Sequence, residues 1–372
     1  MNIKAWLTSR TKATTRPKTR WCSTSLEKDR EAFMPAKRLP TSETACVLGF
    51  DGGGTKSICA IADADGAILG VGLSGCTNFQ GAGVHAAGEE VRRAIGQALA
   101  QARVPTGRIA YAAYGAAGAD RDADFDAVAD YILPHNPAGR MLLANDTTIA
   151  LRAGTPDGVG VALICGTGSN CIGFNGVGAQ AKVGGLGRFT GDAGSGENVV
   201  ERAIIAAARG LDGRGPKTVL AERLASALGL AEITDIISLY YLDDYRPPDL
   251  GALAPVVFKS AQDGDPVALK LLNRIGDELA ENAVAACRRL FARNDPVRIV
   301  LGGSILQKAR PPIFVERITR GVRAKFPQAR ITRLKVEPVL GAVYLALDLL
   351  HGHAGAARMA KAHRTYASFA VR

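Results

Sequence analysis

The sequence predicts a two-domain α/β protein in which one supersecondary unit occurs twice. The chain has 372 residues, which is longer than most single domains. A strand, a Gly/Thr-rich turn, a second strand, an Asp-Gly or Asn-Gly hairpin signal and a third strand begin near residue 46, and the series begins again about 114 residues later. Self-similarity of this kind indicates an internal duplication.

The first copy is expected to form five short strands and two helices. A helix is expected over 84–102, because Val91, Ile95 and Leu99 recur at helical spacing. A second helix is expected around 122–133. The expected strands are 46–50, 57–62, 67–72, 109–114 and 141–144.

The second copy repeats the pattern and adds more helix. Asn175-Gly176 is its hairpin signal. Helix is expected from about 196 to 209 and onward to about 290, with one apolar stripe that includes Leu279, Val284 and Cys287. The expected strands are 159–164, 171–174 and 298–301.

The basic charge of the chain belongs to its two ends. The net charge is +11, but residues 45–351 hold 32 Lys and Arg against 31 Asp and Glu. Residues 1–44 are expected to be a disordered basic arm, with Met34 as a candidate natural start, and residues 352–372 a basic tail. The near-neutral core disfavours a nucleic-acid partner. The chain also lacks the run of roughly 20 apolar residues that would predict a membrane span.

Cysteine and histidine patterns predict neither disulfides nor a metal site. The seven cysteines form no CxxC pair, and the five histidines are scattered. Reduced thiols and a cytoplasmic location are therefore expected.

Three glycine elements are candidate anion-binding sites, because glycine lets backbone N–H groups approach a phosphate closely. They are the turns at 52–55 and 166–168 and the segment 302–304. The first turn differs from a P-loop, because the P-loop ends in Gly-Lys-Ser or Gly-Lys-Thr and this chain has Thr55 at the glycine position. The second departs from a dinucleotide fingerprint, since Cys171 replaces the third glycine. A strand follows both turns, so neither a Walker ATPase nor a Rossmann dehydrogenase fits.

Three aspartates accompany these elements, and Asp146 and Asp192 each have an ordinary alternative. Asp51 ends a buried strand, where its carboxylate could hold the water shell of Mg²⁺. Asp146 precedes an apolar helical segment, so it could be a helix N-cap and nothing more. Asp192 lies in a glycine-rich segment, where a turn or cap residue is equally usual.

Five segments in the right order resemble the sugar kinase and actin-type ATPase superfamily. Within it, the sequence is most similar to the N-acetylglucosamine kinase and BadF/BadG/BcrA/BcrD ATPase group. The most family-specific segment follows the pattern GGxGxxxGDxGS. The segments are GFDGGGTKS (49–57), ANDTTIAL (144–151), CGTGSN (165–170), GGLGRFTGDAGSG (184–196) and LGGS (301–304).

The resemblance implies two duplicated ribonuclease-H-like, actin-like ATPase domains with a nucleotide cleft between them. The domains would span 45–152 and 153–339, followed by a closing helix at 340–351. ATP and Mg²⁺ would be the cofactors, with Asp51 holding Mg²⁺ through water and Asp146 acting as the catalytic base. The resemblance assigns the ATP phosphates to Gly52, Gly53, Gly54, Thr55, Gly166, Thr167 and Gly168, the adenosine to Gly302, Gly303 and Ser304, and the sugar to Asn78, Asn170 and Asp192.

The function implied by the resemblance is phosphorylation of N-acetylglucosamine or glucosamine by ATP, at the 6-hydroxyl. Ala193 departs from the acidic or polar residue usual in the family, which leaves the choice of sugar open. The alternative is an ATPase that activates a partner dehydratase or reductase. That branch uses exposed cysteines to hold an iron–sulfur cluster, and no exposed cysteine pair is evident here. A homodimer is left open.

Overall fold

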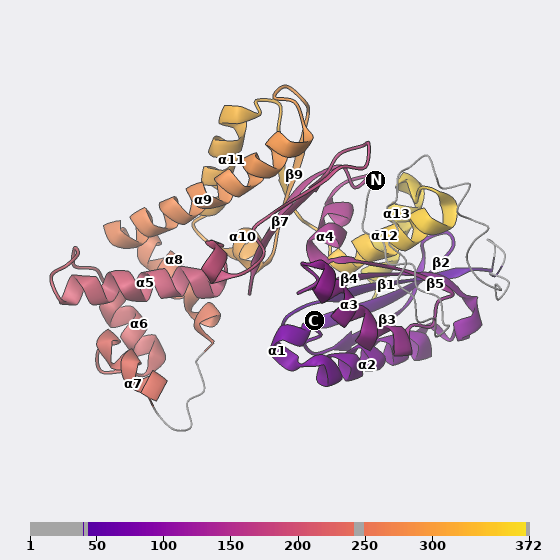
Figure 1. Cartoon of the computed structure of the whole chain (residues 1–372), viewed down its shortest axis with the longest axis horizontal. Helices are drawn as coiled ribbons and strands as arrows, with labels where there is room; N and C mark the ends of the chain where they lie inside the picture. Colours follow the sequence, from indigo (N-terminus) through magenta and orange to yellow (C-terminus); the bar gives the residue numbers. More distant parts are fainter. Residues whose placement is uncertain (1–39, 41–43, 242–248, 370–372) are drawn as a thin grey trace. The chain divides into compact units, whose positions relative to one another are not determined.

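A computed structural model describes residues 40, 44–241 and 249–369, with the side chains of 239–241 left out (Figure 1). The arm expected at 1–44 lies outside these residues, except for residues 40 and 44. The described chain forms two compact units. Unit 1 comprises residues up to Gly160, the segment Ile172–Ala181 and residues from Leu334 onward; unit 2 comprises Val161–Cys171 and Lys182–Arg333. The C-terminal helices thus belong to the unit that contains the first copy.

The first sheet has five strands in the order β3-β2-β1-β4-β5. Its strands are β1 Cys46–Gly52, β2 Ser57–Asp63, β3 Ile68–Ser74, β4 Ile109–Ala116 and β5 Arg140–Asn145. The first three strands pair antiparallel, whereas β4 and β5 extend the sheet in parallel with β1. Parallel strands end at the same edge, so the residues after β1 and β5 lie at one edge of the sheet.

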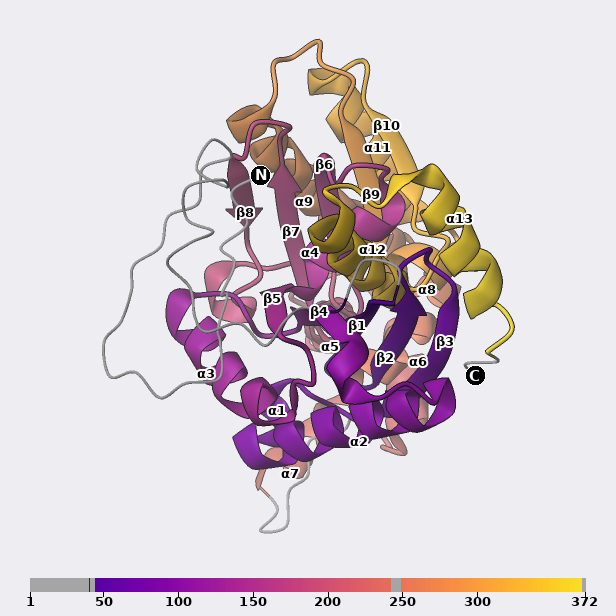
Figure 2. The same cartoon turned by 90° about the vertical axis from the view of Figure 1, so that its right-hand side faces the viewer.

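Helices cover both faces of this sheet. They are α1 Phe79–Ala82, α2 Val84–Ala102, α3 Asp122–Ile132, α4 Asp146–Gly154, α12 Pro338–His351 and α13 Gly355–Tyr366, with 3₁₀ turns at Thr106–Arg108 and Leu133–His135. Leu48 and Phe50 of β1 pack with α2 and α3, and Val47 packs on the opposite face with α12 (Figure 2). The helix expected over 84–102 is confirmed at those bounds.

The structure corrects the expectation that 352–372 is a tail beyond the folded chain. Residues 355–366 form α13, and its Ala362 and Tyr366 are buried in the core beneath α12. The backbone N–H of Ile68 donates to Thr365 Oγ1 (2.8 Å), which fixes the end of α13 beside β3. The sparse apolar positions of this helix, among many Ala and charged residues, conceal its amphipathic pattern.

The second sheet repeats the strand order of the first. Its strands are β6 Gly160–Cys165, β7 Ser169–Phe174, β8 Gln180–Val183, β9 Arg298–Gly302 and β10 Arg330–Arg333. Their order is β10-β9-β6-β7-β8, with β9 parallel to both β6 and β10. Strand β10 was not predicted from the sequence. The duplication that the sequence predicted is confirmed, since both sheets place the strand before the glycine turn at the centre.

The two hairpin turns are built alike. Asp63 Oδ1 accepts a hydrogen bond from the backbone N–H of Ala67 (2.8 Å) in the first copy. Asn175 Oδ1 accepts the equivalent bond from Ala179 (2.8 Å) in the second. In each turn, a short side chain thus accepts a hydrogen bond from the backbone N–H four residues later, and this bond closes the turn.

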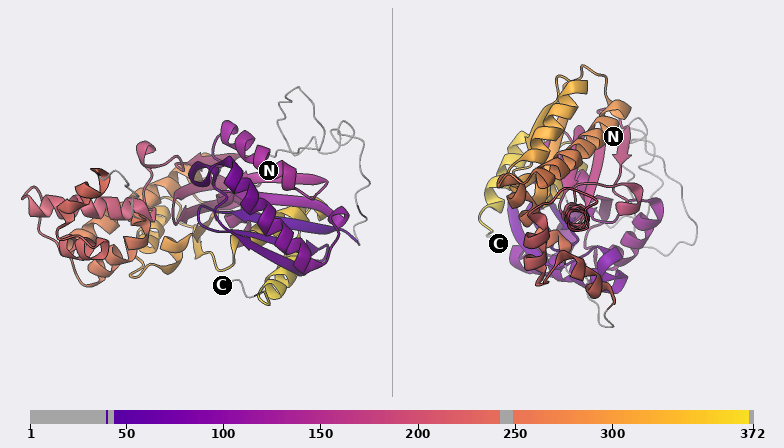
Figure 3. Two further views of the ribbon diagram at one scale, coloured as in Figure 1. Left: turned by 90° about the horizontal axis from the view of Figure 1, so that it is seen from below. Right: turned by 90° about the vertical axis from the view of Figure 1, so that its left-hand side faces the viewer.

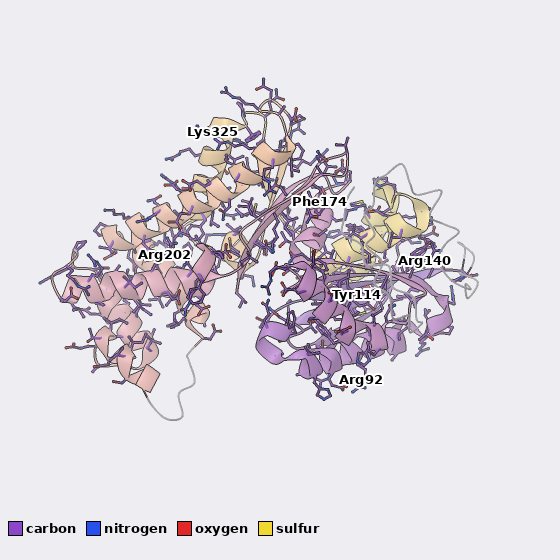
Figure 4. The ribbon with its side chains drawn as sticks, in the orientation of Figure 1. Arg92, Tyr114, Arg140, Phe174, Arg202 and Lys325 are labelled. Carbon is purple, nitrogen blue, oxygen red and sulfur yellow. The ribbon has the colours of Figure 1, made fainter. Side chains whose placement is uncertain are left out.

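Unit 2 is otherwise helical. Its helices are α5 Gly196–Leu211, α6 Leu220–Leu228, α7 Ile236–Tyr241, α8 Ala254–Gln262, α9 Pro266–Leu290, α10 Ser304–Lys308 and α11 Ile313–Lys325, with 3₁₀ turns at Arg188–Thr190, Ile233–Asp235 and Leu250–Leu253. Helices α5, α6 and α8 pack together (Figure 3), and α9 packs along α11. Arg202, labelled in Figure 4, joins α5 to Glu278 of α9 through two hydrogen bonds of 2.9 and 2.7 Å. Within residues 40, 44–241 and 249–369, no helix is long and apolar enough to span a membrane.

Candidate functional site

The first glycine turn joins β1 to β2 and exposes its backbone. Strand pairing ends at Gly52 and Ser57, so residues 53–56 form the turn. Residues 54–56 are exposed, whereas Asp51 just before the turn is partly buried. The N–H of Gly53 donates to Ser57 Oγ (3.3 Å), which holds the entry to the turn. An exposed glycine turn of this kind can present backbone N–H groups to an anion.

A buried hydroxyl pair connects this turn to the segment that carries Asn78. Ser57 Oγ and Thr77 Oγ1 lie 2.7 Å apart, and both residues are buried. The N–H of Thr77 donates to the carbonyl of Gly53 (3.1 Å), and the hydroxyl of Tyr131 donates to the carbonyl of Thr77 (2.8 Å). The Asn78 side-chain oxygen caps α1. Asn78 is therefore held beside the first glycine turn.

The predicted base Asp146 is the first residue of α4, directly after β5. The structure assigns the N-cap to Asn145, whose Oδ1 accepts the N–H of Thr147 (2.9 Å). The alternative that Asp146 itself is the cap is therefore wrong. Asp146 Oδ1 also accepts from Thr147 N–H (2.8 Å). Its carboxylate lies at a helix N-terminus, where the helix dipole favours negative charge.

Asp51, Asp146 and Glu337 form an acidic cluster in unit 1. Burial and, to a smaller extent, the negative charges of Asp146 and Glu337 raise the pKa of Asp51, while Lys56 lowers it. The resulting pKa is about 7. Glu337 is the N-cap residue of α12, but its side chain makes no capping hydrogen bond. The structure thus brings Asp51 and Asp146 together, as their predicted roles require. Glu337 was not identified from the sequence, and its position before Pro338 is the only local signal.

The second glycine turn, residues 166–168, joins β6 to β7 in unit 2. The N–H of Gly166 donates to the carbonyl of Gly168 (2.8 Å), and the N–H of Gly196 donates to the carbonyl of Gly166 (2.9 Å). Gly196 begins α5, so the N-terminus of a 16-residue helix is tied to an exposed glycine turn. A helix N-terminus stabilises negative charge, which suits a phosphate.

The third glycine element lies beside the second turn. Because β9 runs parallel to β6 and Gly302 pairs with Ile164, residues 302–304 leave the sheet next to residues 166–168. Gly303 has φ +84°, and a Cβ there would lie 2.2 Å from the carbonyl oxygen of Cys165. Only glycine allows this approach, since any side chain would collide with the β6 backbone.

Asn170 and Asp192 support the glycine-rich loop at 184–196. The Asp192 carboxylate accepts the N–H groups of Leu186 (2.7 Å) and Gly187 (2.6 Å). Gly185 has φ +79°, and a Cβ there would lie 2.4 Å from Asn170 Oδ1. Two of the three residues predicted to contact sugar, Asn170 and Asp192, therefore lie against the same loop. Asp192 also has the structural role in that loop that its sequence context allowed.

The predicted site residues fall into two groups, one in each unit. Unit 1 holds Asp51, the turn at 52–55, Asn78 and Asp146, and unit 2 holds the remainder. In the part of the chain that the structure describes, no three or more His, Cys, Asp or Glu side chains are spaced to hold a metal ion directly. Mg²⁺ usually keeps several of its waters and takes few protein ligands.

The fold and these motifs define an actin-like α/β protein with two related units. Residues 48–346 match the BadF/BadG/BcrA/BcrD ATPase family, and the chain belongs to it. The crystal structure of a candidate N-acetylglucosamine kinase from Chromobacterium violaceum aligns with a TM-score of 0.65 at 22% identity, covering 82% of this chain and 99% of that one. The family and fold predicted from the sequence are confirmed.

Two curated relatives are similar to this chain over most of its length. The N-acetylmuramic acid/N-acetylglucosamine kinase of Clostridium acetobutylicum is 29% identical over 304 residues, which cover 81% of this chain and 97% of the relative. The N-acetyl-D-glucosamine kinase of Dictyostelium discoideum is 28% identical over 316 residues, which also cover 81% of this chain and 97% of the relative.

Proposed function

We propose that this protein is an ATP-dependent kinase that phosphorylates the 6-hydroxyl of N-acetylglucosamine or glucosamine. The observation that carries the proposal is the position of Asp146. Because Asn145 caps α4, the Asp146 carboxylate is not needed as the N-cap and lies in the same acidic cluster as Asp51. The names of the two curated relatives support a hexosamine as the acceptor.

Asp146 would act as the general base. Its carboxylate accepts the proton of the sugar hydroxyl while the hydroxyl oxygen forms a bond to the γ-phosphorus and the bond from that phosphorus to the ADP oxygen breaks. Phosphoryl transfer depends mainly on positioning and on charge stabilisation. The anchoring of Asp146 at the start of α4 supplies that positioning for the base.

Backbone N–H groups would bind the phosphates of ATP. Gly52, Gly53, Gly54 and Thr55 contribute the first turn, and Gly166, Thr167 and Gly168 the second, next to the N-terminus of α5. Gly302, Gly303 and Ser304 would border the adenosine. Asp51 would hold Mg²⁺ through water, and the bound cation neutralises phosphate charge. The negative charges that raise the pKa of Asp51 are the observation that favours a cation there.

Asn78, Asn170 and Asp192 would bind the sugar hydroxyls. Amide and carboxylate groups can donate to or accept from hydroxyls in fixed directions, which is how polar side chains select a sugar. Ala193 is buried beside Asp192 and offers no polar group. Discrimination between N-acetylglucosamine and glucosamine would therefore depend on the other residues of the loop.

The test is a coupled assay of ADP release with N-acetylglucosamine, glucosamine, N-acetylmuramic acid and glucose. Asp146→Asn is expected to lower kcat by about 10²–10⁴-fold, because it removes the base. ADP binding should be nearly unchanged. The matched control is Asp126→Asn, which makes the same chemical change on the exposed side of α3 and should keep the wild-type rate. A near-wild-type rate for Asp146→Asn would refute the catalytic assignment.

ADP release that no sugar stimulates would move the proposal to the alternative, an ATPase that activates a partner enzyme. The iron content of the purified protein then becomes informative. Burial raises the pKa of the Cys165 and Cys171 thiols, and raises that of Cys287 to about 12. Those thiols are poor candidates for metal ligands, which bind as thiolates. A cytoplasmic location and the absence of a nucleic-acid partner remain predictions.

A further inference from the structure

Asp120 is a partly buried carboxylate to which the proposed function assigns no role. Its Oδ1 accepts a hydrogen bond from Nδ2 of Asn145 (3.0 Å), and the carbonyl of Ala119 accepts a second from the same amide nitrogen (3.2 Å). Asn145 is buried and directly precedes the predicted base Asp146. An amide nitrogen has two hydrogens to donate, and one short loop supplies acceptors for both.

The orientation of the Asn145 amide determines which side chain caps α4. With Nδ2 toward Asp120, the amide oxygen faces the backbone N–H of Thr147 and accepts from it (2.9 Å). If the amide were reversed, its oxygen would face two other oxygens at the loop, and its nitrogen would face the Thr147 N–H. Asp146 Oδ1 shares that N–H (2.8 Å), so it would take over the cap if the Asn145 oxygen turned away.

The loop that carries Asp120 also contacts the other predicted site residues of unit 1. The N–H of Ala117 donates to the carbonyl of Gly52, at the start of the first glycine turn (2.8 Å). Gly118 has φ +81°, and a Cβ there would lie 2.7 Å from Asn78 Oδ1, so this loop packs closely against the predicted sugar residue. The segment 117–120 therefore links the phosphate turn, Asn78 and the cap of the helix that begins with the base.

We propose that Asp120 is a positioning residue for Asp146, the base of the proposed kinase reaction. By accepting from the Asn145 amide, Asp120 keeps the Asn145 oxygen on the Thr147 N–H, and Asp146 is not drawn into the position of the cap. The inference rests on the proposed function, because the orientation of Asp146 matters here for its role as general base. Misplacing a catalytic group by about 1 Å can lower the rate about 10²-fold.

Asn145→Asp tests the proposal in the sugar-dependent ADP-release assay. Aspartate caps helices as well as asparagine does, so the variant keeps an acceptor for α4 but places an oxygen in front of Asp120. We expect kcat to fall about 10²-fold with little change in the KM for sugar or ATP. Adding Asp120→Asn restores a donor opposite the new carboxylate, and this double variant should recover about 10-fold of the loss. Asp120→Asn alone keeps an acceptor oxygen and should stay near the wild-type kcat.

The matched control separates the exchange of donor and acceptor from the change in charge. Asn145→Asp combined with Asp126→Asn has the same net charge as the first double variant, but Asp126 lies on the exposed side of α3. Its kcat should therefore remain as low as that of Asn145→Asp alone. Equal recovery in the two double variants, or a wild-type kcat in Asn145→Asp, would overturn the proposal. Recovery of the urea midpoint without recovery of kcat would also overturn it, because the link would then be structural only.

If Asn145→Asp fails to fold, Asp120→Ala takes its place, because it removes the acceptor and adds no charge. A kcat about 10-fold below that of the wild type, with little change in KM, supports the proposal, and a wild-type kcat contradicts it. The proposed function fails in a different way: it is rejected, and this inference with it, if no sugar stimulates ADP release by the wild-type protein. This inference alone is rejected if the wild type is an active kinase and these variants lose no kcat.

Discussion

At the residue scale, the proposed role of Asp51 requires an ionised carboxylate, and ionising this side chain lowers the stability of the folded protein. Its pKa rises from 3.8 to about 7 in the folded protein. Between these values the folded chain keeps a proton that the unfolded chain has lost, so the contribution of Asp51 to stability is most favourable at low pH and is lost as pH rises to about 7. Asp51→Asn should therefore stabilise the metal-free protein by about 1–3 kcal/mol more at pH 8 than at pH 5. Thermal denaturation at both pH values checks this expectation.

Asp124 provides a control, because its pKa is shifted in the opposite direction to that of Asp51. The hydrogen bond and charge of Arg121 hold the pKa of Asp124 below its usual value. This carboxylate contributes stability above its unfolded pKa and loses it only in acid. Asp124→Asn should cost about 1–2 kcal/mol equally at pH 5 and pH 8. If Asp51→Asn behaved in the same way, the account of the acidic cluster would be wrong.

At the element scale, α4 owes its position to Arg152. This side chain is 1% exposed and makes two hydrogen bonds to Asp348 of α12 (2.8 and 3.0 Å) and one to the carbonyl of Thr155 (3.0 Å). Its guanidinium also lies over the Tyr344 ring, 5.4 Å from the centroid. The helix that begins with Asp146 is thereby joined to the helix that Glu337 precedes.

Arg152→Lys should therefore destabilise the protein by about 3–5 kcal/mol, because lysine cannot form the paired bonds and leaves buried groups unpaired. Urea denaturation measures the loss. The control is Arg92→Lys on the exposed side of α2, labelled in Figure 4, where the solvent-exposed ion pair with Glu89 should contribute little to stability. A similar small loss in both variants would show that Arg152 does not hold α4.

Elements could be predicted from the sequence where a residue pattern repeats within a short segment, and could not be predicted where they depend on packing between distant segments. The α2 stripe and the two glycine hairpins are visible because their spacing repeats within a few residues. The strand β10, with alternating Arg, Ile, Thr and Arg, has too little apolar character to be recognised. Glu337 lies far along the chain from Asp51, and only the packing of α12 on the first sheet brings its charge near Asp51.

At the scale of the whole molecule, the two copies keep one sheet order and have diverged in chemistry. The first copy carries Asp51 and Asp146, whereas the second carries the glycine turn joined to the α5 N-terminus. Duplication supplied two equivalent strand–turn–strand edges.

The net positive charge of the chain can be separated from the chemistry of the proposed site. Residues 1–44 hold 10 Lys and Arg against 4 Asp and Glu, whereas the family match begins at residue 48. A chain that lacks residues 1–43 should keep wild-type turnover and thermal stability. It should elute from heparin at lower salt, because fewer cations contact the polyanion. A full-length control with Gln at the Lys and Arg positions of 1–43 separates charge from length. Loss of turnover in the shortened chain alone would mean that this segment contributes to the enzyme by its contacts and not by its charge.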